Sequence, residues 1–182
     1  MADRILLVGM MGAGKSTVAR LLAARLGWTW LDTDTELSRT ARSSVADLFA
    51  QEGESRFRHQ ESRALQKVLG RDGPLVVSVG GGAVLDQANR AAIGAAGTVV
   101  WLRARPDTLL DRVSDGAGRP LLAGRRPEDR AHTLRALDRQ RRPLYAEVAD
   151  QIIDVDGLDA PTVTDRLLDA VGLDAPGRGV HP

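Results

Sequence analysis

The sequence predicts an α/β fold, in which a parallel sheet of five strands lies between two layers of helices. Five short apolar runs alternate with longer segments of helical periodicity along almost the whole chain. Strands that alternate with helices of this length form parallel sheets covered on both faces. A chain of 182 residues is also the size of one domain with a single core. We therefore expect one three-layer α/β/α domain over residues 1–172.

The amino-terminal half supplies three of the strands. Residues 4–8 are a short apolar strand, and residues 16–26 carry apolar side chains at helical spacing up to a stop at Gly27. The second strand covers residues 28–31. Helical segments follow at residues 35–40, 45–51 and 54–69, separated by serines 43 and 44 and by Gly53. The third strand, residues 75–79, ends in three consecutive glycines.

The carboxyl-terminal half continues the alternation. Helix 86–95 and strand 98–102 precede helix 106–113, which has a proline in its first turn. Residues 127–148 are helical around an interruption at Pro143, residues 151–155 form the last strand, and residues 161–171 form the closing helix. Residues 173–182 are polar and rich in glycine and proline, so we expect a flexible tail.

The composition is that of an ordinary soluble globular protein. Hydrophobic residues make up 43% and charged residues 27%, and the net charge of +1 gives no reason to expect nucleic acid or a membrane as partner. The apolar run at residues 5–8 is far shorter than the roughly 20 residues that span a bilayer. The absence of cysteine excludes disulfides, thiolate metal sites and thiol nucleophiles, and suits a reducing cytosol. We expect a cytoplasmic monomer.

The clearest motif is a phosphate-binding loop. Residues 9–16 read Gly-Met-Met-Gly-Ala-Gly-Lys-Ser and match G-x-x-x-x-G-K-[ST], between a predicted strand and a predicted helix. Backbone N–H groups and the positive end of the helix dipole would hold the phosphates. Lys15 would bridge the β- and γ-phosphates, and Ser16 would give its hydroxyl to Mg²⁺. The nucleotide-binding residues expected here are Gly12, Ala13, Gly14, Lys15, Ser16 and Thr17.

Two carboxylates, Asp32 and Asp34, close the second strand. One of them can hold a magnesium-bound water, and the other can accept the proton of an attacking hydroxyl. The alternative is that Asp34 or Thr33 caps the helix that we expect to begin near residue 35.

Three further features lie on a helix, at a strand end and in a loop. Arg58 stands three residues before Glu61, so a local ion pair can orient its guanidinium, although most helix arginines simply face solvent. The glycines at 80–82 permit a ligand to approach the backbone, or form a simple tight turn. The glycine-rich stretch around Arg119 fits a mobile lid at about residues 112–126 that excludes water from the phosphates, or a disordered surface loop.

Taken in order, these motifs resemble the shikimate kinase family over nearly the whole chain. The matching stretches are residues 9–17, 31–34, 44–49 with 53–54 and 57–58, 80–83, 119–122 and 141–145. The resemblance implies a P-loop kinase that transfers the γ-phosphoryl group of ATP to the 3-hydroxyl of shikimate, in aromatic amino-acid biosynthesis, with Mg²⁺. It also implies an acceptor-binding region at about residues 33–61.

The resemblance assigns roles residue by residue. The residues that would hold shikimate are Asp34, Arg58 and Arg141, with Gly80, Gly81 and Gly82 beside them. Those that would serve the nucleotide and the metal are Arg112, Arg119 and Asp32, besides the phosphate loop. Lys15, Asp34 and Arg119 would be catalytic. One departure is that residues 157–161 lack the arginine that family members often place in the adenine pocket.

The chemistry of the residues agrees with these roles. Shikimate carries a carboxylate and three hydroxyls, and the planar guanidinium fork of Arg58 or Arg141 suits a carboxylate. Asp34 would position the 3-hydroxyl and could receive its proton, although a loose phosphoryl transition state asks little of a base.

Two rival functions are consistent with part of the pattern. A kinase of gluconate or of a nucleoside monophosphate would share the phosphate loop and the fold. A guanine-nucleotide switch generally carries an N/T-K-x-D motif, which this chain lacks because Lys15 and Lys67 are its only lysines.

Overall fold

The computed structural model describes residues 3–113, 122 and 126–173. Its centre is one parallel sheet of five strands in the order β2-β3-β1-β4-β5. The strands are β1 (Arg4–Val8), β2 (Thr29–Asp32), β3 (Leu75–Ser78), β4 (Thr98–Arg103) and β5 (Gln151–Asp154). The predicted five-stranded parallel sheet is confirmed.

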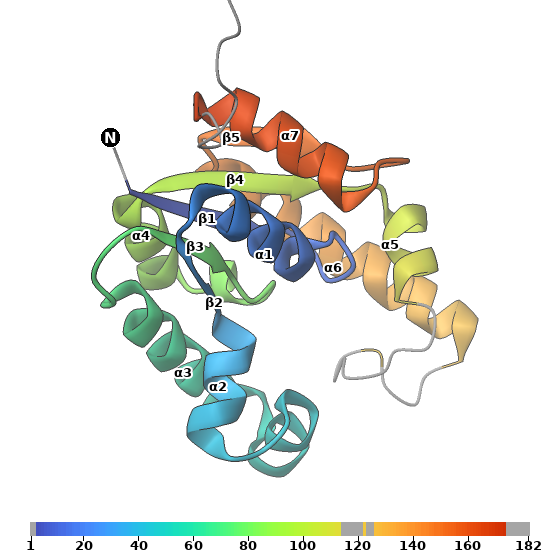
Figure 1. Ribbon diagram of the computed structural model, residues 1–182. Coiled ribbons are helices and arrows are strands. Elements are labelled where there is room, and N and C mark those ends of the chain that lie inside the picture. Colours follow the sequence, from blue (N-terminus) through green and yellow to red (C-terminus); the bar gives the residue numbers. More distant parts are fainter. Residues whose placement is uncertain (1–2, 114–121, 123–125, 174–182) are drawn as a thin grey trace, which may run out of the picture.

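Helices cover both faces of this sheet (Figure 1). The helices α1 and α7 pack together on one face, and α4 and α6 pack together on the other. The helices are α1 (Lys15–Leu26), α2 (Thr33–Ala41), α3 (Val45–Leu69), α4 (Gln87–Ala96), α5 (Pro106–Arg112), α6 (Pro127–Val148) and α7 (Ala160–Val171). Within the described residues, none of these helices is long and apolar enough to cross a membrane.

Most predicted boundaries agree with the structure to within two residues, with three differences. The helix expected from residue 35 begins at Thr33, because the side chain of Asp32 caps it. Pro143 lies inside α6 without interrupting it. A short 3₁₀ helix, η1 (Ala83–Leu85), follows the triple glycine and was not predicted.

The main core lies on the two faces of the central strands. Every residue of β3 is buried, as are four of the five residues of β1. This is why these segments read as continuous apolar runs rather than as alternating patterns, since both sides of each strand face helices.

A second, smaller apolar cluster lies between α2 and α3. It consists of four buried side chains, Leu37, Leu48, Phe57 and Ala64. In Figure 1 these two helices extend below the sheet, away from the main core. We call this the α2–α3 cluster. It holds together the part of the chain predicted to bind the acceptor.

Gly53 divides α3 where the sequence predicts a break. Its backbone has φ 74° and ψ 169°, which is non-helical. This region of φ and ψ is accessible almost only to glycine. Gly53 therefore allows α3 to change direction beside the α2–α3 cluster.

Replacing Gly53 by alanine is expected to lower the free energy of unfolding by about 1–3 kcal/mol, because the Cβ atom makes this backbone conformation costly. The control is Gly94→Ala, since Gly94 is exposed within α4 and a Cβ there meets nothing within 4 Å. That change should stabilise the protein by about 0.5–1 kcal/mol. Urea denaturation measures the free energy of unfolding of both variants. Equal stability of the two variants would contradict the special conformation at Gly53.

Candidate active site

The carboxyl ends of β1, β2 and β3 lie side by side at one edge of the sheet. Ser78, the last residue of β3, pairs in register with Leu7 of β1 and with Asp32 of β2. The phosphate loop, the Asp32–Asp34 segment and the triple glycine all follow these strands. Ligands of open parallel sheets bind at this edge. The three motifs therefore meet in space.

The phosphate loop depends on glycine at two positions. A Cβ at Gly9 would lie 2.5 Å from the carbonyl oxygen of Leu102, so only glycine lets the loop pass β4. Gly14, with φ 90°, is the N-cap of α1 and provides no side chain that caps the helix. This is expected where the first backbone N–H groups of a helix face an anion. The ammonium of Lys15 donates to the carbonyl oxygens of Gly9 (2.7 Å) and Met10 (3.0 Å).

A cavity of about 280 Å³ lies over the loop. Its lining includes Lys15, Ser16 and Thr17 of the predicted nucleotide site. Asp34 and Arg112 line the same cavity, although they come from α2 and α5. The structure thus brings the phosphate loop and the predicted acceptor carboxylate into one space.

The carboxylate of Asp32 accepts three hydrogen bonds. One carboxylate oxygen accepts the hydroxyl of Ser16 at 2.6 Å, and the other accepts the backbone N–H groups of Asp34 (2.9 Å) and Thr35 (3.1 Å). The residue that caps α2 is therefore Asp32, and neither Asp34 nor Thr33. The hydroxyl of Ser78 lies 3.2 Å from that of Ser16 and completes a row of three oxygen-bearing side chains.

These oxygens suit Mg²⁺. The ion prefers oxygen ligands in octahedral geometry and usually takes only one or two from protein, with the rest from water and phosphate. Asp32 and Ser16 supply that number at the mouth of the phosphate loop. In the described part of the chain, no group of three or more His, Cys, Asp or Glu residues could hold an ion by itself.

Three oxygens converge on Gly80. A Cβ at this residue would lie 2.6 Å from Asp34 Oδ1, 3.1 Å from Glu61 Oε1 and 3.3 Å from Thr33 Oγ1. The buried hydroxyl of Thr33 also accepts the N–H of Gly80 at 2.8 Å. The first glycine of the turn is therefore required for β3 to approach α2 and α3 this closely.

Arg58 lies against the last glycine of the same turn. Its guanidinium donates to Glu61 at 2.8 Å and to Glu54 at 3.3 Å, so the predicted pairing with Glu61 is confirmed. A Cβ at Gly82 would lie 2.0 Å from one terminal nitrogen of Arg58. Glu61 is 4% exposed, and its charge is compensated by this ion pair. Arg58 is thus held over the glycine turn rather than turned to solvent.

Arg141 reaches the turn from α6. Although it is only 2% exposed, it donates to the carbonyl oxygen of Gly81 at 3.2 Å. The hydroxyl of Tyr145 donates to the same oxygen at 2.7 Å. Burial raises the pKa of Tyr145 far above its ordinary value, so this phenol stays protonated and remains a donor. Together they fix the orientation of the Gly81 carbonyl.

Both arginines have a buried nitrogen without an acceptor. The Nε atoms of Arg58 and Arg141 are buried and form no hydrogen bond within the described residues. Buried donors are nearly always paired, because leaving one unpaired costs free energy. A ligand carboxylate is the kind of group that satisfies guanidinium N–H groups. This pair of unsatisfied donors points to an anionic ligand at the glycine turn.

Arg112 connects the phosphate loop with the segment before α7. Its guanidinium donates to the carbonyl oxygens of Gly12 (3.4 Å), Val155 (3.2 Å) and Leu158 (3.3 Å). It thus lies between the phosphate loop and the segment that joins β5 to α7. Arg119 and most of the predicted lid lie outside the described residues.

Two residues of the site were not found from the sequence. Ser78 stands directly after the apolar part of β3, at the level of Asp32, and its signal is only a hydroxyl at a strand end. Thr33 was considered only as a helix cap, whereas its hydroxyl binds the N–H of Gly80. That contact joins residues 47 positions apart, which spacing along the chain does not reveal.

Comparison with known proteins identifies the family. The sequence model described as shikimate kinase matches residues 11–172. The shikimate kinase of Moorella thermoacetica is 45% identical over 163 residues, covering 90% of this chain and 91% of the relative. The shikimate kinase of Symbiobacterium thermophilum is 47% identical over 155 residues, covering 84% of this chain and 86% of the relative.

Solved structures agree with the sequence comparison. The shikimate kinase of Acinetobacter baumannii, solved in complex with shikimate, superposes with a TM-score of 0.87 at 37% identity and covers 92% of each chain. A gluconokinase from Sinorhizobium meliloti superposes with a TM-score of 0.63 at 19% identity, covering 94% of this chain and 92% of that one, which shows a common fold alone. The family match and the two curated relatives together show that this chain belongs to the shikimate kinase family.

Proposed function

We propose that this protein transfers the γ-phosphoryl group of ATP to the 3-hydroxyl of shikimate, giving shikimate 3-phosphate and ADP. The observation that carries the proposal is the pair of arginines at the glycine turn, Arg58 and Arg141, each with a buried and unsatisfied Nε, beside a phosphate loop. An acceptor that bears a carboxylate fits this pair. We also infer that the reaction takes place in the cytoplasm, which suits a cysteine-free chain.

The nucleotide is held by the phosphate loop. The backbone N–H groups of residues 12–17 surround the β-phosphate at the start of α1, where the helix dipole favours negative charge. Lys15 leaves the carbonyl oxygens of Gly9 and Met10 to contact the β- and γ-phosphates. Its charge then offsets the negative charge that develops as the terminal group departs. Arg112 adds positive charge to the same cavity. Family resemblance assigns Arg119 to the nucleotide as well.

Ser16 and Asp32 hold the magnesium ion. The hydroxyl of Ser16 is fixed by its bond to Asp32, so both oxygens are already oriented toward the loop. An Mg²⁺ ion held there would supply positive charge to offset that of the nucleotide phosphates. Because Asp32 also caps α2, the metal site and the acceptor helix share one residue.

The acceptor lies over the glycine turn. Arg58 and Arg141 bind its carboxylate through the guanidinium N–H groups that lack protein acceptors. The absence of side chains at Gly80 and Gly82 lets Asp34 and Arg58 lie directly against the turn, where they face the acceptor. Asp34 lines the same cavity as Lys15 and binds the hydroxyl that attacks the γ-phosphate. It positions this hydroxyl and receives its proton as the bond to phosphorus forms.

The decisive test is a coupled ADP-release assay with shikimate, gluconate and CMP as acceptors, each with ATP and Mg²⁺. We expect kcat/KM for shikimate to exceed the other two by roughly a hundredfold or more, since the acceptor must place its carboxylate at the two arginines and its hydroxyl at Asp34 at the same time. The assay without acceptor serves as the control for ATP hydrolysis. A preference for gluconate or CMP would reject the assigned substrate.

Arg58→Ala is expected to raise the Kd of shikimate roughly tenfold to a hundredfold, because a charge-assisted contact to the carboxylate is lost. The Kd of ATP should stay within about twofold of its original value, a shift of less than half a kcal/mol. Arg139→Ala is the matched control, since Arg139 is exposed on α6 and lines none of the site. Calorimetry measures the Kd of shikimate and the Kd of ATP for each variant. Unchanged affinity for shikimate in Arg58→Ala would exclude the assigned carboxylate contact.

Asp34→Asn should lower kcat by roughly 10²- to 10⁴-fold while ATP still binds, because the amide cannot accept the proton of the hydroxyl. Single-turnover kinetics measure the loss of rate, and calorimetry measures the affinity of the variant for ATP. If kcat remained within a few-fold of the original value, Asp34 would serve neither to position the hydroxyl nor to accept its proton.

A further inference from the structure

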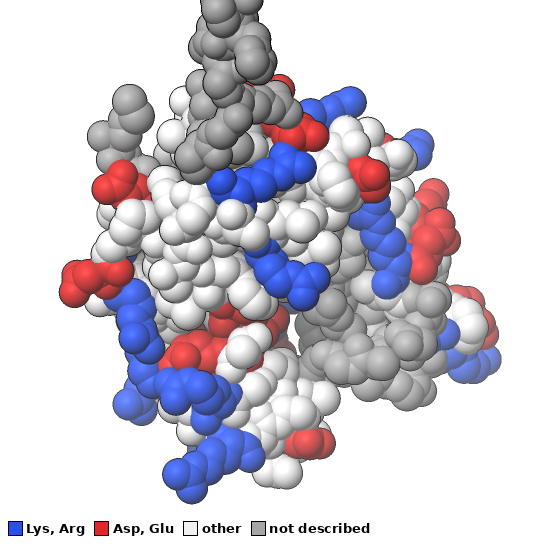
Figure 2. Space-filling view, in the orientation of Figure 1, with Lys and Arg blue, Asp and Glu red and all other residues white. Residues whose placement is uncertain are grey.

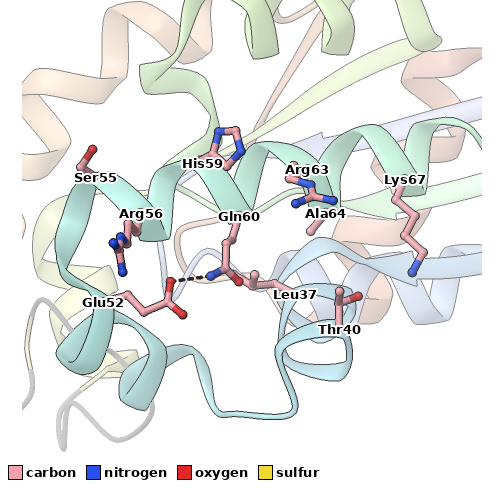
Figure 3. A pocket seen from close by; sticks show the side chains of 10 residues that line it. All are labelled: Leu37, Thr40, Glu52, Ser55, Arg56, His59, Gln60, Arg63, Ala64 and Lys67. Atoms are coloured by element: carbon pink, nitrogen blue, oxygen red, sulfur yellow. Dashed lines mark hydrogen bonds between the residues drawn. The ribbon is translucent and has the colours of Figure 1, made fainter.

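The largest cavity among those described lies outside the site discussed so far. It has a volume of about 720 Å³ and opens between α2 and α3 (Figure 3). Its lining residues are Leu37, Thr40, Glu52, Ser55, Arg56, His59, Gln60, Arg63, Ala64 and Lys67. None of them belongs to the phosphate loop or the glycine turn. Pockets that hold small organic ligands have about 300–1,000 Å³.

Three basic side chains and one neutral amide line one wall of this cavity. Arg56, Gln60, Arg63 and Lys67 follow a spacing of four, three and four residues, which places them on one face of α3. In Figure 3 these side chains extend from α3 toward the side of α2, and Leu37 and Thr40 face them. Figure 2 shows basic side chains gathered at the lower end of the molecule, where Figure 1 places α2 and α3.

Two of these cations lack a carboxylate partner. Lys67 pairs with Glu36 of α2 at 2.8 Å, and Glu52 binds Gln60 rather than an arginine. Arg56 and Arg63 form no ion pair with any described residue. Other arginines of this region do form such pairs, as Arg58 does with Glu61. Two guanidiniums over one hollow therefore retain their full capacity to bind an anion.

The floor of the cavity is apolar. Leu37 is 2% exposed and Ala64 is 5% exposed, and both belong to the α2–α3 cluster. A ligand that combines an apolar body with an anionic group would cover the floor and meet the arginines together. Inorganic phosphate alone would leave most of the volume unfilled.

We infer that this cavity is a second ligand site, which binds a small organic anion with an apolar body between α2 and α3. The α2–α3 cluster under its floor also contains Phe57, the neighbour of Arg58. Asp34 stands on α2, one turn before Leu37. An occupant would therefore brace the two helices that carry the acceptor residues. The effect on the acceptor residues rests on the proposed function, whereas the binding of a ligand in the cavity does not.

The probe for the test is anilinonaphthalene sulfonate, whose fluorescence rises on binding, together with phenylnaphthylamine, which lacks the sulfonate. We expect saturable binding of the sulfonate to the whole protein, weakened roughly tenfold or more in Arg56→Gln/Arg63→Gln. Phenylnaphthylamine should bind more weakly and respond little to that change. The double variant Arg20→Gln/Arg139→Gln removes the same charge from exposed positions on α1 and α6, and should bind as the original does.

Any of three results would contradict the proposed site. The sulfonate could bind the two double variants with equal affinity, the neutral probe could bind as tightly as the sulfonate, or ATP–Mg²⁺ with shikimate could displace the sulfonate. Circular dichroism and the single variant Arg63→Gln exclude misfolding as the cause of lost binding. The coupling is tested separately by calorimetry of shikimate with and without saturating sulfonate. An unchanged Kd of shikimate would reject the coupling and leave the binding result standing, whereas failure to phosphorylate shikimate bears only on the proposed function.

Discussion

The arrangement of the site depends on three consecutive residues without side chains. At Gly80 the carboxylate of Asp34 approaches within 2.6 Å of where a Cβ would stand, and at Gly82 the guanidinium of Arg58 approaches within 2.0 Å. Between them, Gly81 presents its carbonyl oxygen to Arg141 and Tyr145. Helices from three parts of the chain therefore converge on bare backbone. With a larger residue at Gly80 the Asp34 carboxylate would have to move, and with one at Gly82 the Arg58 guanidinium would have to move.

Charge balance is the second constraint on this edge of the sheet. Asp34 and Glu61 both place an oxygen near Gly80, and two carboxylates in such proximity repel each other. Arg58 compensates Glu61 through an ion pair whose acidic side chain is 5% exposed. Breaking a buried pair of this kind leaves an uncompensated charge, which is strongly unfavourable. Arg58 therefore has a structural role besides its proposed role in ligand binding, because the pair with Glu61 already determines its position.

Much of this architecture could be predicted from the sequence, because the relevant signals are local. The alternation of apolar runs and helical segments predicts the sheet, and the spacing of Gly9 to Ser16 predicts the phosphate loop. Spacing within one helix likewise predicts the pair of Arg58 and Glu61. Contacts between distant segments are different. The hydrogen bond from Gly80 to Thr33 and the contact of Ser78 with Ser16 join distant segments and produce no periodic pattern in the sequence. Both are therefore visible only in the structure.

The separate α2–α3 cluster has a consequence for how this protein can change over evolutionary time. Four buried side chains hold this region, and they share no member with the large core around the sheet. Regions with few buried contacts open locally at a lower free energy than global unfolding. Substitutions there can therefore alter what the helices recognise while the sheet and its phosphate loop keep their stability. Amide hydrogen exchange that is faster in α2 and α3 than in β1 and β3 would be the physical signature of this independence.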